Sequence, residues 1–190
     1  AVSVSRDDIL KVWDVATGCI LHTLTGHNHL VTGVALSVDG QLAVSASLDK
    51  TLKVWDIPTG RELRTLTGHS KEVNGVALSA DGQLAVSASS DKTLKVWDVT
   101  TGRELHTLTG HNDEVVGVAL SADKNLVVSA SSDHTLKVWD ISAVLALPPQ
   151  MSKAEGRKAI VAPEHVLREL TANIIALSAD GRLAVSASTD

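Results

Sequence analysis

Hydrophobic and polar residues follow the same order in one unit of this chain after another. In the unit from Ala43 to Leu84, four stretches carry strand-like patterns: AVSAS, TLKVWDI, RELRTLT and VNGVALS. The first three alternate apolar and polar residues at least in part, and the last is almost entirely apolar. Turn-forming residues such as Asp81-Gly82 and Thr101-Gly102 separate such stretches. The pattern predicts four antiparallel strands in each unit and no helix.

The unit repeats with a period of 42 residues. The repeat is marked by a tryptophan followed by aspartate, at Trp13, Trp55, Trp97 and Trp139. The unit from Ala85 to Leu126 differs from the one before it at nine of 42 positions. A period of this length predicts a repeat protein, in which neighbouring units stack to bury a core that none of them can bury alone.

Three Gly-His pairs and four Trp-Asp pairs, recurring in register with the strand pattern between them, resemble the WD40 β-propeller family. The resemblance implies an all-β fold of about four blades, each of four antiparallel strands. Repeats this nearly identical are also similar to the propellers of bacterial, especially cyanobacterial, multidomain signalling proteins, in which the array senses or scaffolds.

The chain divides into five parts on this alignment. The first and last are partial blades, at residues 1–25 and 172–190, and the blades between them span 26–67, 68–109 and 110–171. The third of these contains an insertion at 142–161, after which HVLRELT is expected to restore the outer strand. Within the insertion, Pro148-Pro149 resist regular structure, and Lys153 to Lys158 form one helical turn or stay mobile. Ala172-Asn173 replaces the next Gly-His pair, so we expect the last blade to be the least rigid.

Four repeats are fewer than the seven or eight blades expected of most rings in this family. Both termini align with positions inside a repeat, so the chain is expected to be an arc of a larger seven- or eight-bladed ring. Its open edges would otherwise expose unpaired strand groups and apolar faces. The further blades are expected from the same parent chain or, as the alternative, from a second copy that forms an eight-bladed ring.

Composition narrows the possible partners and location. The net charge is −5 and no basic run exceeds two residues, which argues against nucleic acid. The single cysteine, Cys19, rules out an internal disulfide and fits a reducing compartment. Apolar runs are too short for a membrane span and the first residues have no signal-peptide layout. We therefore expect a cytoplasmic protein.

Each full unit also carries histidine, serine and aspartate at fixed offsets, which by composition resembles a hydrolase triad. Three identical active sites in tandem, each beside a tryptophan, are better explained by structure. The WD40 resemblance implies that these side chains form a buried hydrogen-bond chain in each blade, and which of the two serines takes part stays open. The candidates are His27, Ser45, Ser47, Asp49, Trp55, His69, Ser87, Ser89, Asp91, Trp97, His111, Ser129, Ser131, Asp133 and Trp139.

Neither a metal nor a cofactor is indicated by the sequence. His27 and His29 form a possible metal pair, but the other units lack the second histidine and no cysteine or carboxylate cluster completes a shell. The glycine-rich turns contain no phosphate-binding motif. We expect no cofactor and no catalytic residue.

Binding residues are sought where the repeats differ from one another, because propeller loops vary on a fixed frame. By the family resemblance, these positions lie together on one rim. They are Asn28, His29, Thr32, Leu48, Ser70, Lys71, Asn74, Ser90, Asn112, Asp113, Val116 and Ser132. Neutral drift after recent duplication is the alternative explanation of the differences.

The sequence thus predicts a non-enzymatic interaction scaffold or sensor platform within a larger multidomain protein. Its partners are other proteins or other blades of the parent chain. The alternative is a self-assembling structural component, either a half-propeller dimer or a subunit of a large complex.

Overall fold

The computed structural model describes residues 1–4, 8–145, 165–168, 174–177 and 184–187. Its strands form five antiparallel sheets. The first sheet contains β1 (Val2–Val4), β2 (Leu10–Trp13) and β3 (Ile20–Leu24). The second contains β4 (Val31–Leu36), β5 (Leu42–Ser47), β6 (Thr51–Asp56) and β7 (Arg61–Thr67). The third contains β8 (Val73–Leu78), β9 (Leu84–Ser89), β10 (Thr93–Asp98) and β11 (Arg103–Thr109).

The last two sheets follow the same order. One contains β12 (Val115–Leu120), β13 (Leu126–Ser131), β14 (Thr135–Asp140) and β15 (His165–Arg168). The other contains β16 (Ile174–Leu177) and β17 (Ala184–Ala187). One short helix, α1 (Ser142–Leu145), follows β14.

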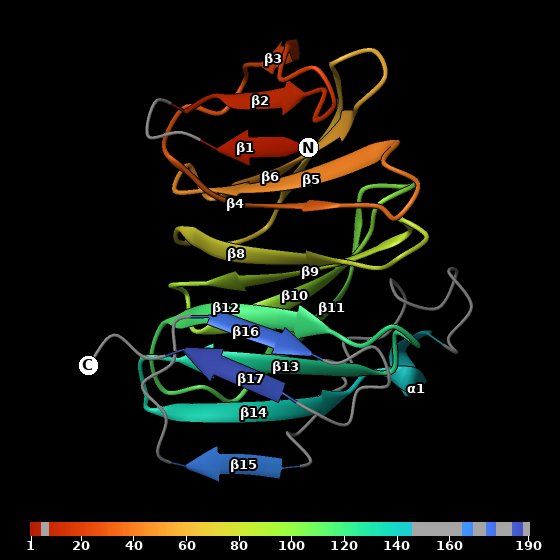
Figure 1. Cartoon of the computed structure of the whole chain (residues 1–190). Coiled ribbons are helices and arrows are strands. Elements are labelled where there is room, and N and C mark those ends of the chain that lie inside the picture. The colour runs from red at the N-terminus through yellow and green to blue at the C-terminus, as the bar shows by residue number, and fades with distance from the viewer. Residues whose placement is uncertain (5–7, 146–164, 169–173, 178–183, 188–190) are drawn as a thin grey trace.

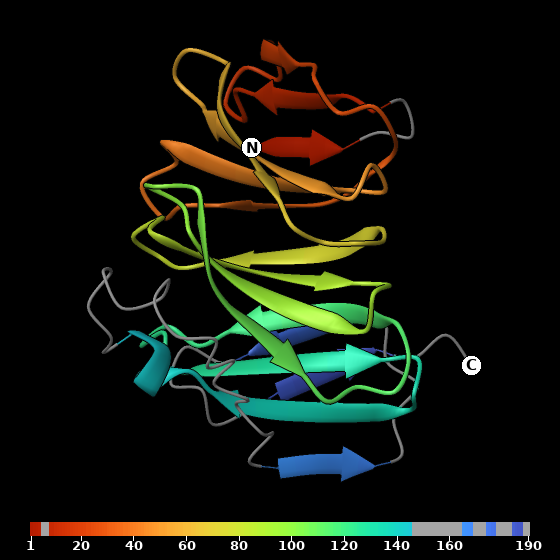
Figure 2. The same cartoon turned by 180° about the vertical axis from the view of Figure 1, so that it is seen from behind.

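The sheets are stacked as blades of an open arc (Figures 1 and 2). The first strands of successive full blades, β4, β8 and β12, lie side by side, and β16 packs against β12. The β1–β3 and β16–β17 sheets lie toward opposite ends of the stack (Figure 1). The prediction of an all-β arc of propeller blades is confirmed.

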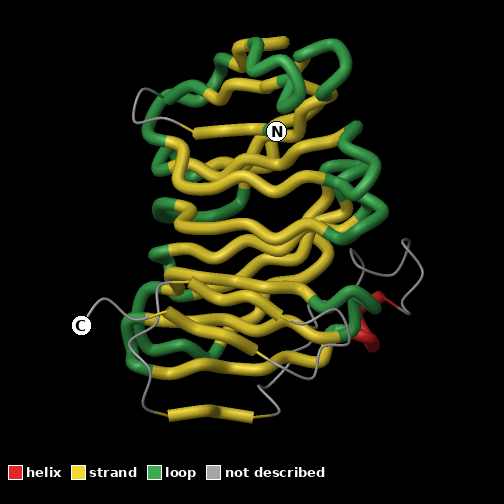
Figure 3. Tube along the Cα trace, viewed as in Figure 1, coloured by secondary structure: helices red, strands yellow, loops and turns green. Residues whose placement is uncertain are grey.

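Loops gather at the two ends of the strands (Figure 3). We call one end the Gly-His face; it is formed by residues 26–30, 68–72 and 110–114 and by the turns at 48–50, 90–92 and 132–134. The other end, which we call the opposite face, contains the turns at 38–41, 80–83 and 122–125 and helix α1. Each loop on the Gly-His face thus enters a first strand and lies beside the turn that joins the second and third strands.

Apolar side chains from adjacent blades meet between the sheets. Val44, Leu52, Val54 and Leu66 of one blade pack against Trp97 and its neighbours in the next blade. The same arrangement recurs at the junctions on either side, where Trp55 and Trp139 are the tryptophans. Because each tryptophan faces the preceding blade, a blade is completed only by its neighbour.

One irregularity recurs in all three full blades. The register between the first two strands shifts around the second residue of the first strand, as between Val31 and Gly33. A second shift, between the third and fourth strands at the tryptophan, occurs in the blades of β4–β7 and β8–β11, as between Val54 and Trp55. A bulge re-aims the side chain of the extra residue and increases the local twist.

The stretch HVLRELT contains the outer strand of the fourth blade, as predicted, and the described part of that strand is β15, His165–Arg168. In β14, Leu136 pairs with Leu167. The corresponding leucines of the other blades, Leu52 and Leu94, pair with Leu66 and Leu108. Turn geometry sets the register of a hairpin, and the insertion removes the Thr-Gly turn that sets it elsewhere.

Helix α1 was not anticipated, because the pattern gave no helical period there. Ser142 donates its backbone N–H to Asp140 Oδ1 at 2.8 Å, and Leu145 donates to the Ile141 carbonyl at 3.3 Å. Val144 packs against the core between the third and fourth blades. The predictions for Pro148-Pro149, Lys153 to Lys158 and Ala172-Asn173 lie outside the described residues. In the part of the chain that is described, no helix is long and apolar enough to cross a membrane.

A core substitution tests the packing between blades. Leu52 is fully buried between the second and third sheets, so Leu52→Ala removes apolar contacts and leaves a cavity. We expect a loss of about 2–5 kcal/mol in the free energy of unfolding, measured by urea denaturation. The matched control is Leu63→Ala, at a leucine that is 52% exposed on the outer strand of the same blade. Equal losses for the two variants would contradict the packing described here.

Candidate functional site

A continuous hydrogen-bond chain crosses the blade of β4–β7. The Trp55 indole Nε1–H donates to Ser45 Oγ at 2.8 Å, and Ser45 Oγ lies 2.7 Å from His27 Nε2. His27 Nδ1 lies 2.7 Å from Asp49 Oδ2. The chain therefore links a buried tryptophan in the third strand to an aspartate in the turn of the Gly-His face.

The other two full blades repeat this chain with distances between 2.7 and 2.9 Å. The structure brings together the corresponding four side chains in each case: Trp97, Ser87, His69 and Asp91 in one blade, and Trp139, Ser129, His111 and Asp133 in the next. In the first blade, Trp13 Nε1 donates to Ser3 Oγ at 2.7 Å.

The indole can only donate, so Ser45 Oγ accepts from it. When His27 is neutral with its proton on Nδ1, the imidazole donates to Asp49 and its Nε2 accepts the proton of the Ser45 hydroxyl. Burial lowers the pKa of His27, and likewise that of His111, against the opposing effect of the neighbouring aspartate. A neutral histidine is therefore the form that the folded blade favours.

Each aspartate also fixes the backbone of the Gly-His face. Asp49 accepts from the Asn28 amide at 3.0 Å, the Thr51 amide at 2.9 Å and Thr51 Oγ1 at 2.6 Å, besides His27. Burial alone would raise the pKa of Asp49, but these hydrogen bonds outweigh it and hold the pKa at about 2. The pKa values of Asp91 and Asp133 are lowered in the same way, against burial.

The structure shows which of the two serines in each blade belongs to the hydrogen-bond chain, a choice that the sequence left open. Ser45 lies in the chain, whereas Ser47 Oγ donates to the His29 carbonyl at 2.8 Å and accepts from the Asp49 amide at 3.0 Å. Ser131 makes the equivalent contact to the Asp113 carbonyl, and Ser89 donates to the Glu72 carbonyl at 2.8 Å and to the Lys71 carbonyl at 3.4 Å. The second serine thus ties the loop after Gly-His to the neighbouring turn, outside the chain itself.

The Ser–His–Asp connectivity matches that of a hydrolase triad, but its accessibility does not. Ser45, Ser87 and Ser129 are all 0% exposed, and each accepts a hydrogen bond from an indole. A nucleophilic serine needs an approach path for a substrate carbonyl and a nearby oxyanion site. The buried serine hydroxyls satisfy the tryptophans and have no such path.

A second repeated network joins lysine, glutamate and threonine side chains, and it was not predicted from the sequence. Lys53 Nζ donates to Glu62 at 2.8 Å and to Thr65 at 2.9 Å, and Thr65 donates to Glu62 at 2.6 Å. Lys95, Glu104 and Thr107 repeat it. A Cβ on Gly26 would lie 3.0 Å from the Glu62 carboxylate and 3.4 Å from the Trp55 ring, so the glycine of Gly-His packs over this network. The 42-residue recurrence of Lys and Glu was the signal that could have found it.

Three of the predicted rim residues lie at the first-strand bulge, and two of them bridge adjacent blades. Thr32, Asn74 and Val116 occupy the first-strand bulge and are half-buried. Thr32 Oγ1 donates to the Val73 carbonyl at 2.7 Å, and Asn74 Nδ2 donates to the Val115 carbonyl at 2.9 Å, so each bridges to the next blade. Val116 packs near Ala130 and Leu136. Ser90 is buried and accepts from Asn74.

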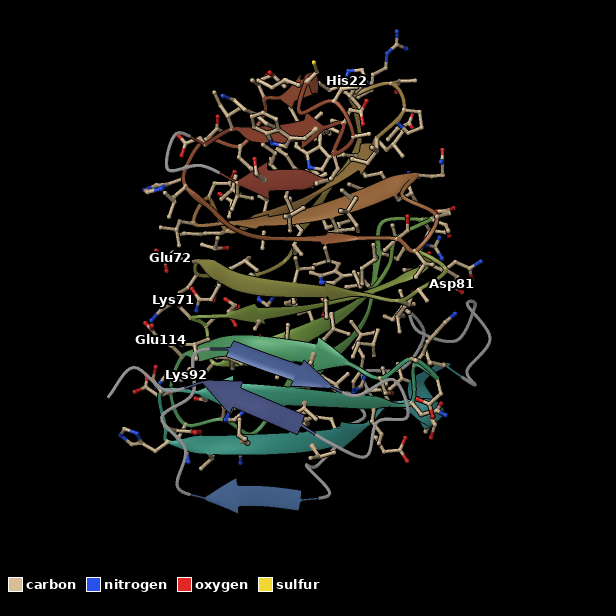
Figure 4. The ribbon with its side chains drawn as sticks, viewed as in Figure 1. His22, Lys71, Glu72, Asp81, Lys92 and Glu114 are labelled. Atoms are coloured by element: carbon tan, nitrogen blue, oxygen red, sulfur yellow. The ribbon has the colours of Figure 1, made fainter. Side chains whose placement is uncertain are left out.

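The remaining candidates are displayed on the Gly-His face. Leu48 is half-buried, and the exposed ones are Asn28, His29, Ser70, Lys71, Asn112, Asp113 and Ser132. The structure adds five further residues to the same face: Lys50, Glu72, Lys92, Glu114 and His134. Lys71, Glu72, Lys92 and Glu114 lie along one edge of the stack, far from Asp81 at the other end of the strands (Figure 4).

The histidines give no metal centre in the described part of the chain. Both ring nitrogens of His27 are engaged by Ser45 and Asp49, and His29 Nδ1 accepts from the Leu30 amide at 2.8 Å. Among the described residues, no group of three or more His, Cys, Asp or Glu side chains could hold a metal ion.

Four-stranded blades in an arc, each with its Trp–Ser–His–Asp chain, define a β-propeller repeat protein. A family profile described as "WD domain, G-beta repeat" matches residues 18–56, 60–98 and 102–140. The chain belongs to the WD40 repeat family, as the sequence motifs predicted. WD40 repeats generally act as scaffolds for protein interactions and are generally non-catalytic.

Removing the indole donor tests the chain. Trp97→Phe leaves Ser87 without its donor and a gap at the junction between blades, so we expect a loss of about 1–3 kcal/mol in the free energy of unfolding. The matched control is Trp13→Phe, because Trp13 is half-buried and its bond to Ser3 is exposed. A loss for Trp97→Phe no larger than that for Trp13→Phe would count against a stabilising role for the chain.

Acid should destabilise the fold in two stages. The folded-state pKa values of His27 and His111 lie below the usual 6.5, so their contribution is complete above that pH and declines as pH falls below it. The aspartates have lowered pKa values, so their contribution is complete above about pH 4 and is lost as pH falls toward 2. The urea midpoint between pH 7.5 and 2 measures both stages. A midpoint that stays constant from pH 7.5 to 4.5 would show that the histidines do not contribute.

Proposed function

We propose that this chain is a non-catalytic protein-interaction platform that binds its partner through the exposed side chains of the Gly-His face. The observation that carries the proposal is that different residues of each repeat hold the backbone and form the exposed surface. The serines, histidines and aspartates that resemble catalytic machinery are engaged in hydrogen bonds within the blade. These hydrogen bonds fix the loops that carry the variable residues.

The fixed backbone suits recognition. On the Gly-His face, the Asp91 carboxylate accepts from the Ser70 amide at 3.0 Å, and Ser90 donates its amide to the Glu72 carbonyl at 3.0 Å. Side chains such as Lys71 therefore project from a backbone held at both sides. A preorganised surface loses little conformational entropy when a partner binds, which favours affinity.

The finer features of the hypothesis follow from composition and family. We propose that the platform is a scaffold or sensor segment of a larger multidomain protein, of the kind found in bacteria. A cytoplasmic location fits the single, exposed Cys19, which has no second cysteine to pair with. The net charge of −5 disfavours nucleic acid as the partner. The partner is then a protein surface.

Cross-linking from two faces tests the proposal. A photoreactive amino acid is placed at Lys71 on the Gly-His face or, as the control, at exposed Gln83 on the opposite face, and the full-length protein is irradiated in its native cells. We expect a protein adduct from position 71 and a weaker or absent one from position 83. Adducts from position 83 alone would place the binding surface elsewhere and reject the proposal.

Binding of the partner identified in this way should depend on the variable residues. The double variant Leu48→Asp, Lys71→Glu changes an apolar and a charged position of the Gly-His face, and we expect at least about a tenfold weaker Kd, corresponding to about 1.4 kcal/mol. The control is Gln41→Asp, Gln83→Glu on the opposite face. Unchanged binding by the first variant would favour neutral drift at these positions.

A further inference from the structure

Charged side chains change sign along the Gly-His face from one blade to the next. Apart from the aspartates held in the hydrogen-bond chains, the blade of β4–β7 presents Lys50, and the blade of β8–β11 presents both signs in Lys71, Glu72 and Lys92. The blade of β12–β15 presents Asp113 and Glu114. This face is therefore basic at one end of the three full blades, mixed in the middle and acidic at the other end.

These charges have no carboxylate or ammonium partner among the described residues. The lysine ion pairs there join Lys53 to Glu62, Lys95 to Glu104 and Lys124 to Asp81, and none of them includes a charge named above. The Lys92 ammonium donates a hydrogen bond to the Asn112 carbonyl at 2.8 Å. The pattern of signs is thus available to a second molecule.

We propose that the Gly-His face binds the same face of a second copy of this chain, with a two-fold axis passing through the middle full blade. The proposal rests on the proposed function, in which this face binds protein, and names the partner. A surface that runs from basic to acidic is complementary to itself when one copy is turned by half a rotation. Lys50 of each copy then faces Asp113 and Glu114 of the other.

The middle blade fits this arrangement as well. Lys71 and Glu72 are adjacent residues of opposite sign, so the two-fold axis brings each near its counterpart of opposite charge. The loops that carry these charges are held in place, because Ser90 and Ser132 donate their amides to the carbonyls of Glu72 and Glu114. Asp8 lies between β1 and β2, beyond the charged stretch of the three full blades.

Exposed ion pairs are individually weak, so the association depends strongly on salt. The Debye length, beyond which salt screens the interaction of two charges, is about 30 Å at 0.01 M salt and about 3 Å at 1 M. We expect a dimer in about 20 mM salt and a monomer in about 0.5 M salt, with at least about a tenfold loss of association between them. Sedimentation equilibrium on the full chain measures both states.

Complementary charge reversals give the decisive test. Variant X is Asp113→Asn, Glu114→Lys, in which asparagine keeps the oxygen that accepts from the residue 114 amide. Variant Y is Lys50→Glu. Each variant alone sets like charges against one another at two symmetric positions, so each should be a monomer at about 20 mM salt. Mixed in equal amounts, X and Y restore opposite charges at both positions and should form a heterodimer, which native mass spectrometry identifies.

A control variant separates a local effect from that of net charge. Gln41→Lys, Gln83→Lys, Ala122→Lys adds the same three positive charges as X to exposed positions of the opposite face, and it should dimerise like the unaltered chain. Circular dichroism melts establish that each variant is folded; if X does not fold, Glu114→Gln replaces it and should weaken the dimer severalfold. A wild-type monomer at low salt, or a mixture of X and Y that stays monomeric, overturns the inference.

The cross-linking experiment keeps the two proposals apart. An adduct from position 71 to another protein, with no self-association at low salt, would support the interaction platform and reject the second copy as its partner. Absence of any adduct from position 71 would reject both.

Discussion

Each blade of this protein is a single layer of strands, so a blade cannot bury either of its own faces. The rest of the structure depends on this constraint. A four-stranded sheet with two apolar faces is stable only when a neighbour lies on each side. The tryptophan of each repeat meets this need because its ring fills the junction with the preceding blade. Its indole N–H, however, is carried into the same junction and must be satisfied there. The chain through serine, histidine and aspartate satisfies it.

The chain also connects the core to the surface. It begins at a tryptophan that is at most 1% exposed and ends at an aspartate whose oxygens hold the loop and the turn of the Gly-His face. Packing between blades and the shape of the recognition surface are therefore parts of one hydrogen-bonded unit. Side chains on that surface can differ between repeats, because their backbone is fixed by residues that do not differ.

Much of this could be predicted from sequence because the repeats are nearly identical. Each strand pattern was seen several times, so the blades and the members of the hydrogen-bond chain could be named. The sequence could not show whether Ser45 or Ser47 belongs to the hydrogen-bond chain, because residues two apart in a strand share a face. In the structure, Ser47 binds the His29 carbonyl of the loop, and Ser45 contacts His27. The bulge was also hidden, because the extra residue leaves no mark in the alternation; hence Thr32 and Asn74 were assigned to the rim. Helix α1 and the register of β15 depend on the insertion, which has no counterpart in other repeats.

The bulge residues carry one more consequence, for the fidelity of folding. A chain built from near-identical units risks pairing a strand with the wrong blade, a characteristic failure of tandem repeats. At the bulge the units are not interchangeable: one junction is bridged by the Thr32 hydroxyl, the next by the longer Asn74 amide, and the position after that is occupied by Val116, which bears no donor. An exchanged blade would therefore leave a carbonyl without its donor or bury an amide without an acceptor. The position of the first strand that differs most between repeats thus distinguishes one junction between blades from the next.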